Sequence, residues 1–118
     1  MLKKVYGSYA EKKVAEFLVA QGYRIRNQNY QKPYGEVDII AQRNETVIFV
    51  EVKYRQNPLL AMTTIITPTK QKKIALVAKE YRARYNLDHH IIRFDVALVV
   101  QDHATATIEY IENAFQGS

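Results

Sequence analysis

Three charged residues interrupt the most apolar part of the chain, and their types suit the hydrolysis of phosphodiester bonds. Asp38 lies in the segment EVDIIA, and Glu51 and Lys53 lie in the next apolar segment, TVIFVEVK. Carboxylate oxygens are ligands for Mg²⁺ or Mn²⁺, and a bound divalent cation polarises a phosphate and lowers the pKa of an attacking water. A lysine beside such a cation can orient the water or stabilise the charged transition state. The three residues therefore predict a divalent-metal site that cleaves phosphodiester bonds.

Two neighbouring strands have to position these side chains. Alternate residues of a strand face the same way. One face of TVIFVEVK is therefore wholly apolar, whereas the other carries Glu51 and Lys53 next to Phe49. In EVDIIA, the same alternation puts Asp38 on one face with Glu36 and Ile40, and it puts the other apolar residues, Val37, Ile39 and Ala41, on the opposite face. Each strand thus places an acidic residue in line with core residues.

The turn between the strands decides whether the two acids meet. The polar residues 42–45 (QRNE) are typical of a hairpin turn. With an even number of turn residues, whether Ala41 lies opposite Thr46 or Gln42 lies opposite Glu45, Asp38 and Glu51 become diagonal neighbours about 7–8 Å apart at the backbone. A slip of one residue would send them to opposite faces of the sheet. We therefore predict an even-length turn and a diagonal Asp38–Glu51 pair.

A purely structural interpretation of these residues competes with the functional one. A single acid-x-acid pair, or a single Glu-x-Lys, is common on the wet face of a hairpin and is then usually structural. Removing a half-buried carboxylate from water costs on the order of several kcal/mol, and neighbouring carboxylates also repel one another. Lys53 can offset one of these charges and a divalent cation the rest. The joint placement of Asp38, Glu51 and Lys53 inside an apolar run favours function, and the residues alone leave both interpretations open.

Composition limits the class of protein. The chain has 118 residues, of which 47% are hydrophobic and 25% charged, and this predicts a single globular domain over residues 1–118. It has no cysteine, which excludes disulfides, thiolate zinc sites and cysteine nucleophiles. No apolar stretch approaches the ~20 residues of a membrane span, and the N-terminus lacks an apolar signal core, so we expect a cytoplasmic protein. A net charge of +5 favours a polyanionic partner such as nucleic acid.

Hydrophobic periodicity and turn signals predict an α/β fold. A helix of about residues 3–21 ends at Gly22, and a second helix begins at Thr67-Pro68, a hydroxyl cap followed by proline. The β-branched segment TVIFVEVK is apolar on both faces and belongs in the middle of a covered sheet. The predicted order is αβββαββ, a mixed sheet of about five strands flanked by helices, with strands near residues 23–30, 36–41, 46–53, 91–100 and 105–112 and a loop at 54–66.

With these residues in place, the chain resembles a known group of nucleases. Asp38 followed by Glu51-Val52-Lys53 is similar to the PD-(D/E)xK signature, with Val37 in place of the proline, which supplies no ligand. More specifically, the chain resembles the YraN-like family of small bacterial proteins, which have the fold of archaeal Holliday-junction resolvases. The features that carry the match run through the chain in order: Gly7, Ala10-Glu11, Gly22-Tyr23, Asn29-Tyr30, Gly35-Glu36-Val37-Asp38, Phe49 to Lys53 with Arg55, Lys70-Gln71 and Arg93 to Val96.

The resemblance implies a restriction-endonuclease-like fold and a role for each site residue. It implies that Asp38, Glu51 and the backbone carbonyl of Val52 bind Mg²⁺ or Mn²⁺, with Lys53 catalytic. Glu11 on the first helix stands where related nucleases complete the site through a water, although a solvated helix residue is an equal alternative. The resemblance also implies a catalytic role for Glu36, either as an extra ligand or as the group that holds Lys53.

The same resemblance implies a nucleic-acid surface around the site. Lys70 and Gln71 begin the second helix, where related nucleases place a residue that contacts phosphate or water, and helix N-termini favour anions. With Arg55 and Lys73 they would form a basic rim for phosphate contacts, although a solvated helix face explains any single lysine. Asp95 is interpreted as a cap or ion-pair partner and Tyr54 as a weak candidate for stacking on a base.

Two functions from different classes follow from this. The resemblance implies a metal-dependent endonuclease that acts on DNA, with branched or structured DNA suggested by analogy alone. Resolvases act as dimers, and Leu59, Leu60 and Met62 either serve a dimer contact or pack into the core. The alternative is a non-catalytic module that keeps the fold and binds nucleic acid or protein. Retention of Asp38, Glu51 and Lys53 argues against that alternative, because a pure binding module gains nothing from buried like charges.

Overall fold

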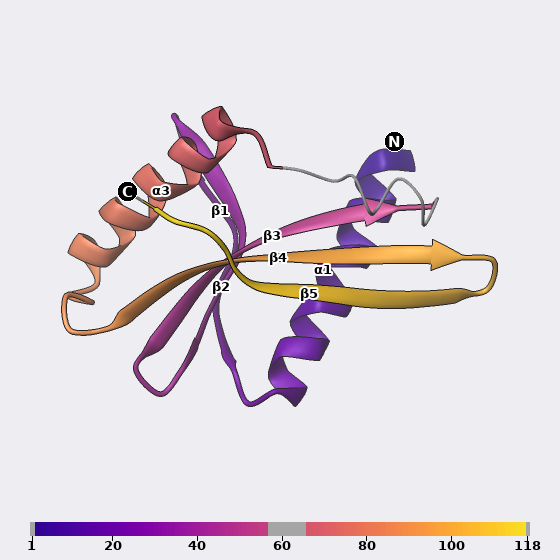
Figure 1. Cartoon of the computed structure of the whole chain (residues 1–118), viewed down its shortest axis with the longest axis horizontal. Coiled ribbons are helices and arrows are strands. Elements are labelled where there is room, and N and C mark those ends of the chain that lie inside the picture. The colour runs from indigo at the N-terminus through magenta and orange to yellow at the C-terminus, as the bar shows by residue number, and fades with distance from the viewer. Residues whose placement is uncertain (1, 57–65, 118) are drawn as a thin grey trace.

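A five-stranded mixed sheet forms the centre of the molecule (Figure 1). The computed structural model describes residues 2–56 and 66–117, with side chains from residue 8 onward. The predicted loop residues Leu59, Leu60 and Met62 lie outside the described residues. The predicted α/β class and the order αβββαββ are confirmed, and the elements are α1 (Leu2–Ala20), β1 (Arg24–Lys32), β2 (Gly35–Arg43), β3 (Thr46–Arg55), α3 (Pro68–Arg84), β4 (Ile91–Asp102) and β5 (Thr105–Phe115).

The strands follow one another across the sheet in the order β1-β2-β3-β4-β5. Only the β3–β4 pair is parallel, and the other three pairs are antiparallel. The strand with the longest apolar run, β3, is therefore central, as predicted. Its residues 47–51 are all buried, because helices cover both of its faces.

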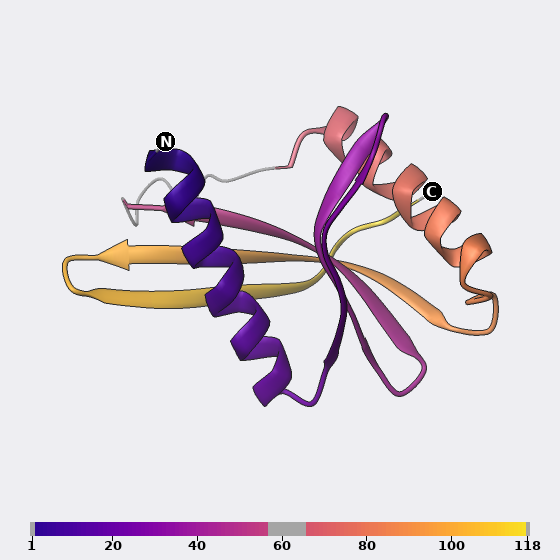
Figure 2. The same cartoon turned by 180° about the vertical axis from the view of Figure 1, so that it is seen from behind.

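The two helices pack on opposite faces of the sheet, α1 on one side and α3 on the other (Figures 1 and 2). On the α1 side, Val14 and Leu18 pack with Ile39 and Val50. On the α3 side, apolar residues of the helix pack with Ile40 and Phe49, and they are Ile74, Val77, Ala78 and Tyr81. No helix among the described residues is both long enough and apolar enough to cross a membrane.

Both helices are bounded by the signals that the sequence carries. Gly22 has a φ of 93°, which lets the chain reverse after α1, and Tyr23 N then donates to Leu18 O at 2.9 Å. Thr67 Oγ1 accepts a hydrogen bond from Lys70 N at 3.2 Å, with Pro68 at the first helical position. This cap begins α3 at a position from which the side chain of Lys70, in its first turn, reaches Glu51 of β3.

Strand β2 changes its facing at Asp38, which the sequence alternation does not predict. Val37 was expected on the same face as Ile39, and this is wrong: Val37 packs on the α3 side with Ile40, whereas Ile39 packs on the α1 side. The β1–β2 register places Asn29 across from Asp38, between the pairs Gln28–Ile39 and Tyr30–Val37. Asn29 has a left-handed φ of 51°, and this local kink breaks the alternation of both strands.

Beyond the kink, the end of the β1–β2 hairpin leans onto α3 (Figure 2). Tyr30 Oη donates to Glu80 Oε2 at 3.1 Å, and Lys32 Nζ pairs with Glu80 Oε1 at 3.2 Å. At Gly35 a side chain would meet Lys73, because an added Cβ would lie 3.1 Å from Lys73 Cβ. The end of the hairpin therefore turns away from β3, and the two strands diverge after the last pair, Ile39–Val50. We call this opening between β2 and β3 the fork.

Candidate metal and nucleic-acid site

The β2–β3 ladder ends immediately before the two predicted metal ligands. Its pairs run from Arg43–Thr46 to Ile39–Val50, so that the turn has two residues, Asn44 and Glu45. The even-length turn is therefore confirmed, but the predicted register is wrong by two residues. Continued by one step, the observed register sets Asp38 directly across from Glu51 rather than diagonal to it. The two-residue turn at this position is accessible because Asn44 adopts a left-handed φ of 54°.

Asp38 closes the fork with its side chain. Val52 N donates a hydrogen bond to Asp38 Oδ2 at 2.8 Å, so the carboxylate accepts from a backbone donor just past the end of the ladder. An unpaired buried N–H is costly, and the carboxylate satisfies it with a charge-assisted bond. This bond holds the Asp38 carboxylate next to the Glu51-Val52-Lys53 segment.

Glu51 is the most enclosed acid of the site. Its side chain is 4% exposed, and its Oε2 pairs with two lysines, Lys53 Nζ at 3.2 Å and Lys70 Nζ at 2.6 Å. Lys53 lies on the same face of β3, whereas Lys70 comes from the first turn of α3. The sequence suggested a phosphate contact for Lys70 and did not predict its ion pair with Glu51. The contact follows from how α3 docks and leaves no signal in the spacing of the residues.

The negative charges of Asp38 and Glu51 repel each other. Burial, reinforced by the negative charge of Glu51, raises the pKa of Asp38 from 3.8 to about 7, although the hydrogen bond from Val52 opposes the shift. Burial lowers the pKa of Lys70, but its hydrogen bond and charge interaction with Glu51 outweigh this and raise the pKa above its ordinary value. The site therefore carries an acid that resists ionisation beside a lysine that is firmly charged.

Glu11 joins the site from the opposite helix. With its amide nitrogen facing the carboxylate, Asn29 donates to Glu11 Oε1 at 2.8 Å. Burial and the charges of Glu36 and Glu51 raise the pKa of Glu11, and the bond from Asn29 lowers it. Glu11 is thus half-buried and interacts with the site acids, unlike a freely solvated helix residue. Asn29 belongs to the residues that carry the family resemblance, but the sequence predicts no role for it in the site; its left-handed φ of 51° is a backbone conformation in which asparagine is enriched.

The other residues predicted for the site lie around Asp38 and Glu51, and their side chains contact other groups. Glu36 is exposed and accepts from Gln31 Nε2 at 2.9 Å, while Lys53 pairs with Glu51 instead. The side chain of Gln71 donates to Ile66 O at 2.8 Å, and Arg55 Nη1 donates to Tyr54 O at 2.8 Å. A hollow of about 370 Å³ next to the site is lined by Gly35, Glu36, Thr67, Thr69, Lys70, Lys73 and Ile74.

Two side chains at the fork, those of Asp38 and Glu51, supply carboxylate oxygens, which are the donors that a hard divalent cation prefers. Within residues 2–56 and 66–117, no three His, Asp or Glu side chains converge to hold a metal ion. Asp38 and Glu51 are oxygen donors on one face, and the raised pKa of Asp38 shows negative charge that a cation would relieve. A cation here would complete its shell with the Val52 carbonyl and water, since Mg²⁺ commonly retains several waters.

Two other predicted positions have structural roles. Asp95 is fully buried and accepts from Arg93 Nε and Nη2 at 2.9 Å each, from Tyr110 Oη at 2.6 Å and from Asn113 N at 2.9 Å. The interpretation of Asp95 as an ion-pair partner is confirmed, whereas Tyr110 and Asn113 were not foreseen. Tyr54 packs against the α1-side core, on the face of β3 opposite Glu51.

Sequence comparisons place the chain among bacterial relatives of similar length. The model of uncharacterised protein family UPF0102 matches residues 10–99. A UPF0102 protein of Nitrosomonas eutropha is 40% identical over 110 residues, which cover 92% of this chain and 91% of that protein. One of Caldicellulosiruptor saccharolyticus is 37% identical over 118 residues, covering 98% and 100%. One of Syntrophus aciditrophicus is 37% identical over 111 residues, covering 93% and 87%. The chain therefore belongs to protein family UPF0102, in agreement with the YraN-like resemblance of its sequence.

Proposed function

We propose that this protein is a divalent-metal-dependent endonuclease that hydrolyses DNA phosphodiester bonds, with branched or structured DNA as its substrate. One observation carries the proposal. Asp38 and Glu51 face each other at the open end of the β2–β3 ladder, where burial and mutual repulsion raise the pKa of Asp38 to about 7. Such a pair costs stability, and a site that binds a cation is a reason to keep it.

In this proposal Asp38, Glu51 and the Val52 carbonyl bind Mg²⁺ or Mn²⁺. When bound, the cation polarises the scissile phosphate and lowers the pKa of the attacking water. Lys53, 3.2 Å from Glu51 Oε2, is the fixed positive charge beside that water. Glu11, held by Asn29, accepts a hydrogen bond from a water of the shell.

A basic surface next to the site supports a nucleic-acid substrate. Lys70 and Lys73 line the hollow beside Glu36, at the N-terminal end of α3. The chain as a whole carries a net charge of +5. Phosphate groups release counterions when they bind such lysines, which favours association at low salt. Lys70, Lys73, Gln71 and Arg55 are therefore proposed to contact the DNA backbone.

A second candidate function is a binding module without catalysis. Both Lys53 and Lys70 pair with the same Glu51 oxygen, and in the described part of the chain no third acid lies close enough to hold a metal ion together with Asp38 and Glu51. In this alternative the lysines neutralise Glu51 permanently, and the basic surface holds nucleic acid without a metal.

Cleavage assays separate the two candidates. Supercoiled plasmid and a synthetic four-way junction are incubated with the protein and Mn²⁺ or Mg²⁺, using wild type, Asp38→Asn and Lys53→Ala. Exposed residues that line neither the fork nor the hollow beside it supply matched controls, Asp102→Asn and Lys79→Ala. We expect cleavage by wild type and both controls, and a loss of at least about 100-fold in the two site variants. Equal cleavage by all five proteins would indicate a contaminant, and binding without cleavage by any of them would favour the module.

Two further parts of the proposal concern the cell. A resolvase must cut two strands symmetrically, so we propose a homodimer that acts on cytoplasmic DNA. Sedimentation velocity with and without a four-way junction measures the oligomeric state. A protein that stays monomeric on a junction it cleaves would remove the dimer from the proposal.

A further inference from the structure

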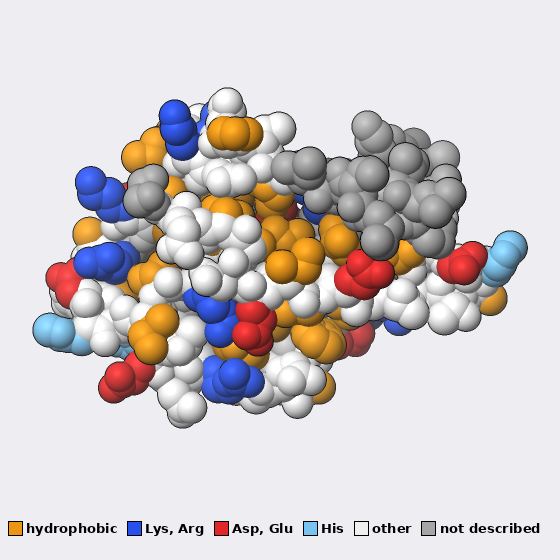
Figure 3. Space-filling view, viewed as in Figure 1, with side chains coloured by type: hydrophobic (Ala, Val, Ile, Leu, Met, Phe, Trp, Pro, Cys, Tyr) orange, Lys and Arg blue, Asp and Glu red, His pale blue; other side chains and the backbone are white. Residues whose placement is uncertain are grey.

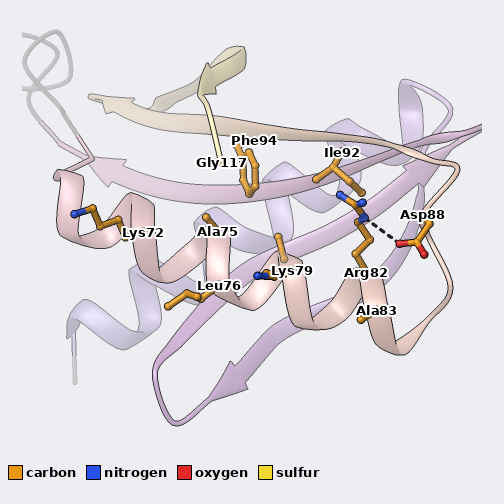
Figure 4. A pocket seen from close by; sticks show the side chains of 11 residues that line it. Lys72, Ala75, Leu76, Lys79, Arg82, Ala83, Asp88, Ile92, Phe94 and Gly117 are labelled. Carbon is orange, nitrogen blue, oxygen red and sulfur yellow. Dashed lines mark hydrogen bonds and ion pairs between the residues drawn. The ribbon is translucent and has the colours of Figure 1, made fainter.

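A groove of about 880 Å³ lies between α3 and the beginning of β4 (Figure 4). One wall is the outer side of α3, and the other is formed by Ile92 and Phe94 of β4 and by Gly117 near the C-terminus. The volume is within the range of about 300–1,000 Å³ that is typical of ligand sites. The lining residues from α3 recur at helical spacing and are Lys72, Ala75, Leu76, Ala78, Lys79, Arg82 and Ala83.

The apolar part of this groove is aliphatic where it is accessible. Leu76 is 52% exposed, although it lies among other apolar side chains. Among the described residues that line the groove, Phe94 has the only aromatic ring; it is 7% exposed and stacks on Phe115 at a centroid distance of 5.1 Å. Bases of single-stranded nucleic acid bind by stacking on exposed aromatic rings. The groove therefore suits aliphatic side chains better than nucleic-acid bases.

The rim of the groove is basic. Within the described parts of the chain, Lys72 and Lys79 make no hydrogen bond or ion pair, and Arg82 shares its charge with Asp88, the only acid of the groove, at 3.3 Å. Figure 3 shows Lys and Arg side chains next to hydrophobic ones over α3. An apolar floor beside unpaired positive charges is complementary to a chain that carries both aliphatic and acidic groups.

From this complementarity we infer that the groove binds a peptide segment of a partner protein that combines acidic and aliphatic side chains. The stretch from Lys72 to Arg82 spans about 15 Å along the helix, which about five extended residues cover. Leucine or isoleucine side chains of the segment contact Leu76 and Ile92, and its carboxylates pair with Lys72 and Lys79. This is a docking surface and not a catalytic one.

The groove is separate from the proposed metal site. With 3.6 residues per turn, Lys72 and Lys79 point about 160–200° away from Lys70, which contacts Glu51. A peptide on this side of α3 therefore leaves the fork between β2 and β3 free. The inference does not depend on the proposed nuclease activity.

The test uses the full chain labelled with ¹⁵N, so that weak binding is measurable by NMR. The probe is a twelve-residue peptide with five acidic residues and three leucines. Comparison peptides replace the leucines by serine or the acids by glutamine, and a twelve-nucleotide single strand tests nucleic acid. We expect the probe to shift the amide signals of residues 75–83 and 92–94. Both comparison peptides should bind at least about 5-fold more weakly, because each lacks one of the two complementary groups.

Matched surface variants assign the binding to the groove. Lys79→Glu is compared with Lys12→Glu on α1, and Leu76→Gln with Val19→Gln, whose parent side chain is 57% exposed. We expect Lys79→Glu and Leu76→Gln to weaken the probe at least about 5-fold and the two α1 variants to leave it unchanged. Probe binding that is undetectable at millimolar concentration, or equal in all variants, would overturn the inference. Tighter binding of the oligonucleotide, with shifts in the same residues, would also overturn it in favour of nucleic acid.

Discussion

Lys70 Nζ lies 2.6 Å from Glu51 Oε2, the oxygen that Lys53 Nζ also reaches at 3.2 Å. This contact joins the first turn of α3 to the central strand and places a second ammonium group on a proposed metal ligand. Two ammonium groups and a divalent cation repel one another when they share one carboxylate oxygen. Lys70 has the more exposed side chain, 39% against 22%, and is the group freer to move away.

Removal of Lys70 is therefore expected to strengthen metal binding. Under the proposed function, Lys70→Ala should lower the Mn²⁺ dissociation constant by about 3- to 10-fold, because the cation no longer competes with an ammonium group. Titration calorimetry measures the constant. Lys79→Ala, on the opposite side of the same helix, is the control and should match wild type. An unchanged constant in Lys70→Ala would mean that Lys70 and the cation do not compete.

Asp38 should make stability depend on pH. Its folded pKa is raised to about 7 from 3.8 by burial and by the charge of Glu51. Between these values the folded protein holds a proton that the unfolded chain releases, so the free energy of unfolding falls as pH rises through this window. Asp38→Asn removes this loss and should be more stable than wild type at pH 8, by on the order of 1 kcal/mol, with a smaller gain at pH 5.

Metal-free urea unfolding at both pH values measures this difference. Asp102→Asn, at the exposed end of β4, is the control, and the difference between its free energy of unfolding and that of wild type should not grow with pH. A less stable Asp38→Asn protein at pH 8 would show that the Val52–Asp38 bond outweighs the repulsion.

Asp95 should be the acid on which folding depends most. Asp95→Ala leaves Arg93, Tyr110 and the Asn113 N–H without their carboxylate in a buried setting. We expect a loss of about 3–5 kcal/mol in the free energy of unfolding. Asp88→Ala breaks the exposed ion pair with Arg82 and should cost about 0–1 kcal/mol. Denaturant unfolding compares the two variants, and similar losses would contradict the structural role of Asp95.

Asn29 should act on Glu11 through its side chain. Asn29→Gly retains the left-handed backbone but removes the donor to Glu11, so the pKa of Glu11 should rise further above its ordinary value. Carboxyl ¹³C titration by NMR measures this pKa. Asn44→Gly makes the same backbone substitution at the β2–β3 turn and should leave Glu11 unchanged. No change in Asn29→Gly would mean that the amide does not hold Glu11.

Much of the fold was predictable because its signals are local. Gly22 and Thr67-Pro68 mark helix ends through their own backbone and side-chain chemistry, and these boundaries are confirmed. The β-branched segment around Phe49 had to be central, since it is apolar on both faces. The parity of the β2–β3 turn, which puts Asp38 and Glu51 on one face, was also predicted correctly.

The errors arise where one residue departs from regular geometry. The two-residue turn at Asn44 moves the register by two positions, and the kink at Asn29 transfers Val37 to the other face. An asparagine tolerates a left-handed backbone without requiring it. Whether an asparagine adopts a left-handed backbone depends on the packing around it, and the local sequence pattern does not predict that packing.

By itself, the sequence determined that Asp38 lies on one strand and that Glu51 and Lys53 share a face of the next, because alternation along a strand follows from the covalent backbone. Only the tertiary structure decided that Lys70 reaches Glu51, that Asn29 holds Glu11 and that Asp38 closes the fork through Val52 N. Each of these contacts joins elements that are separate in the sequence. Their geometry depends on how the helices and the hairpin dock on the sheet, which is a balance of packing over the whole core.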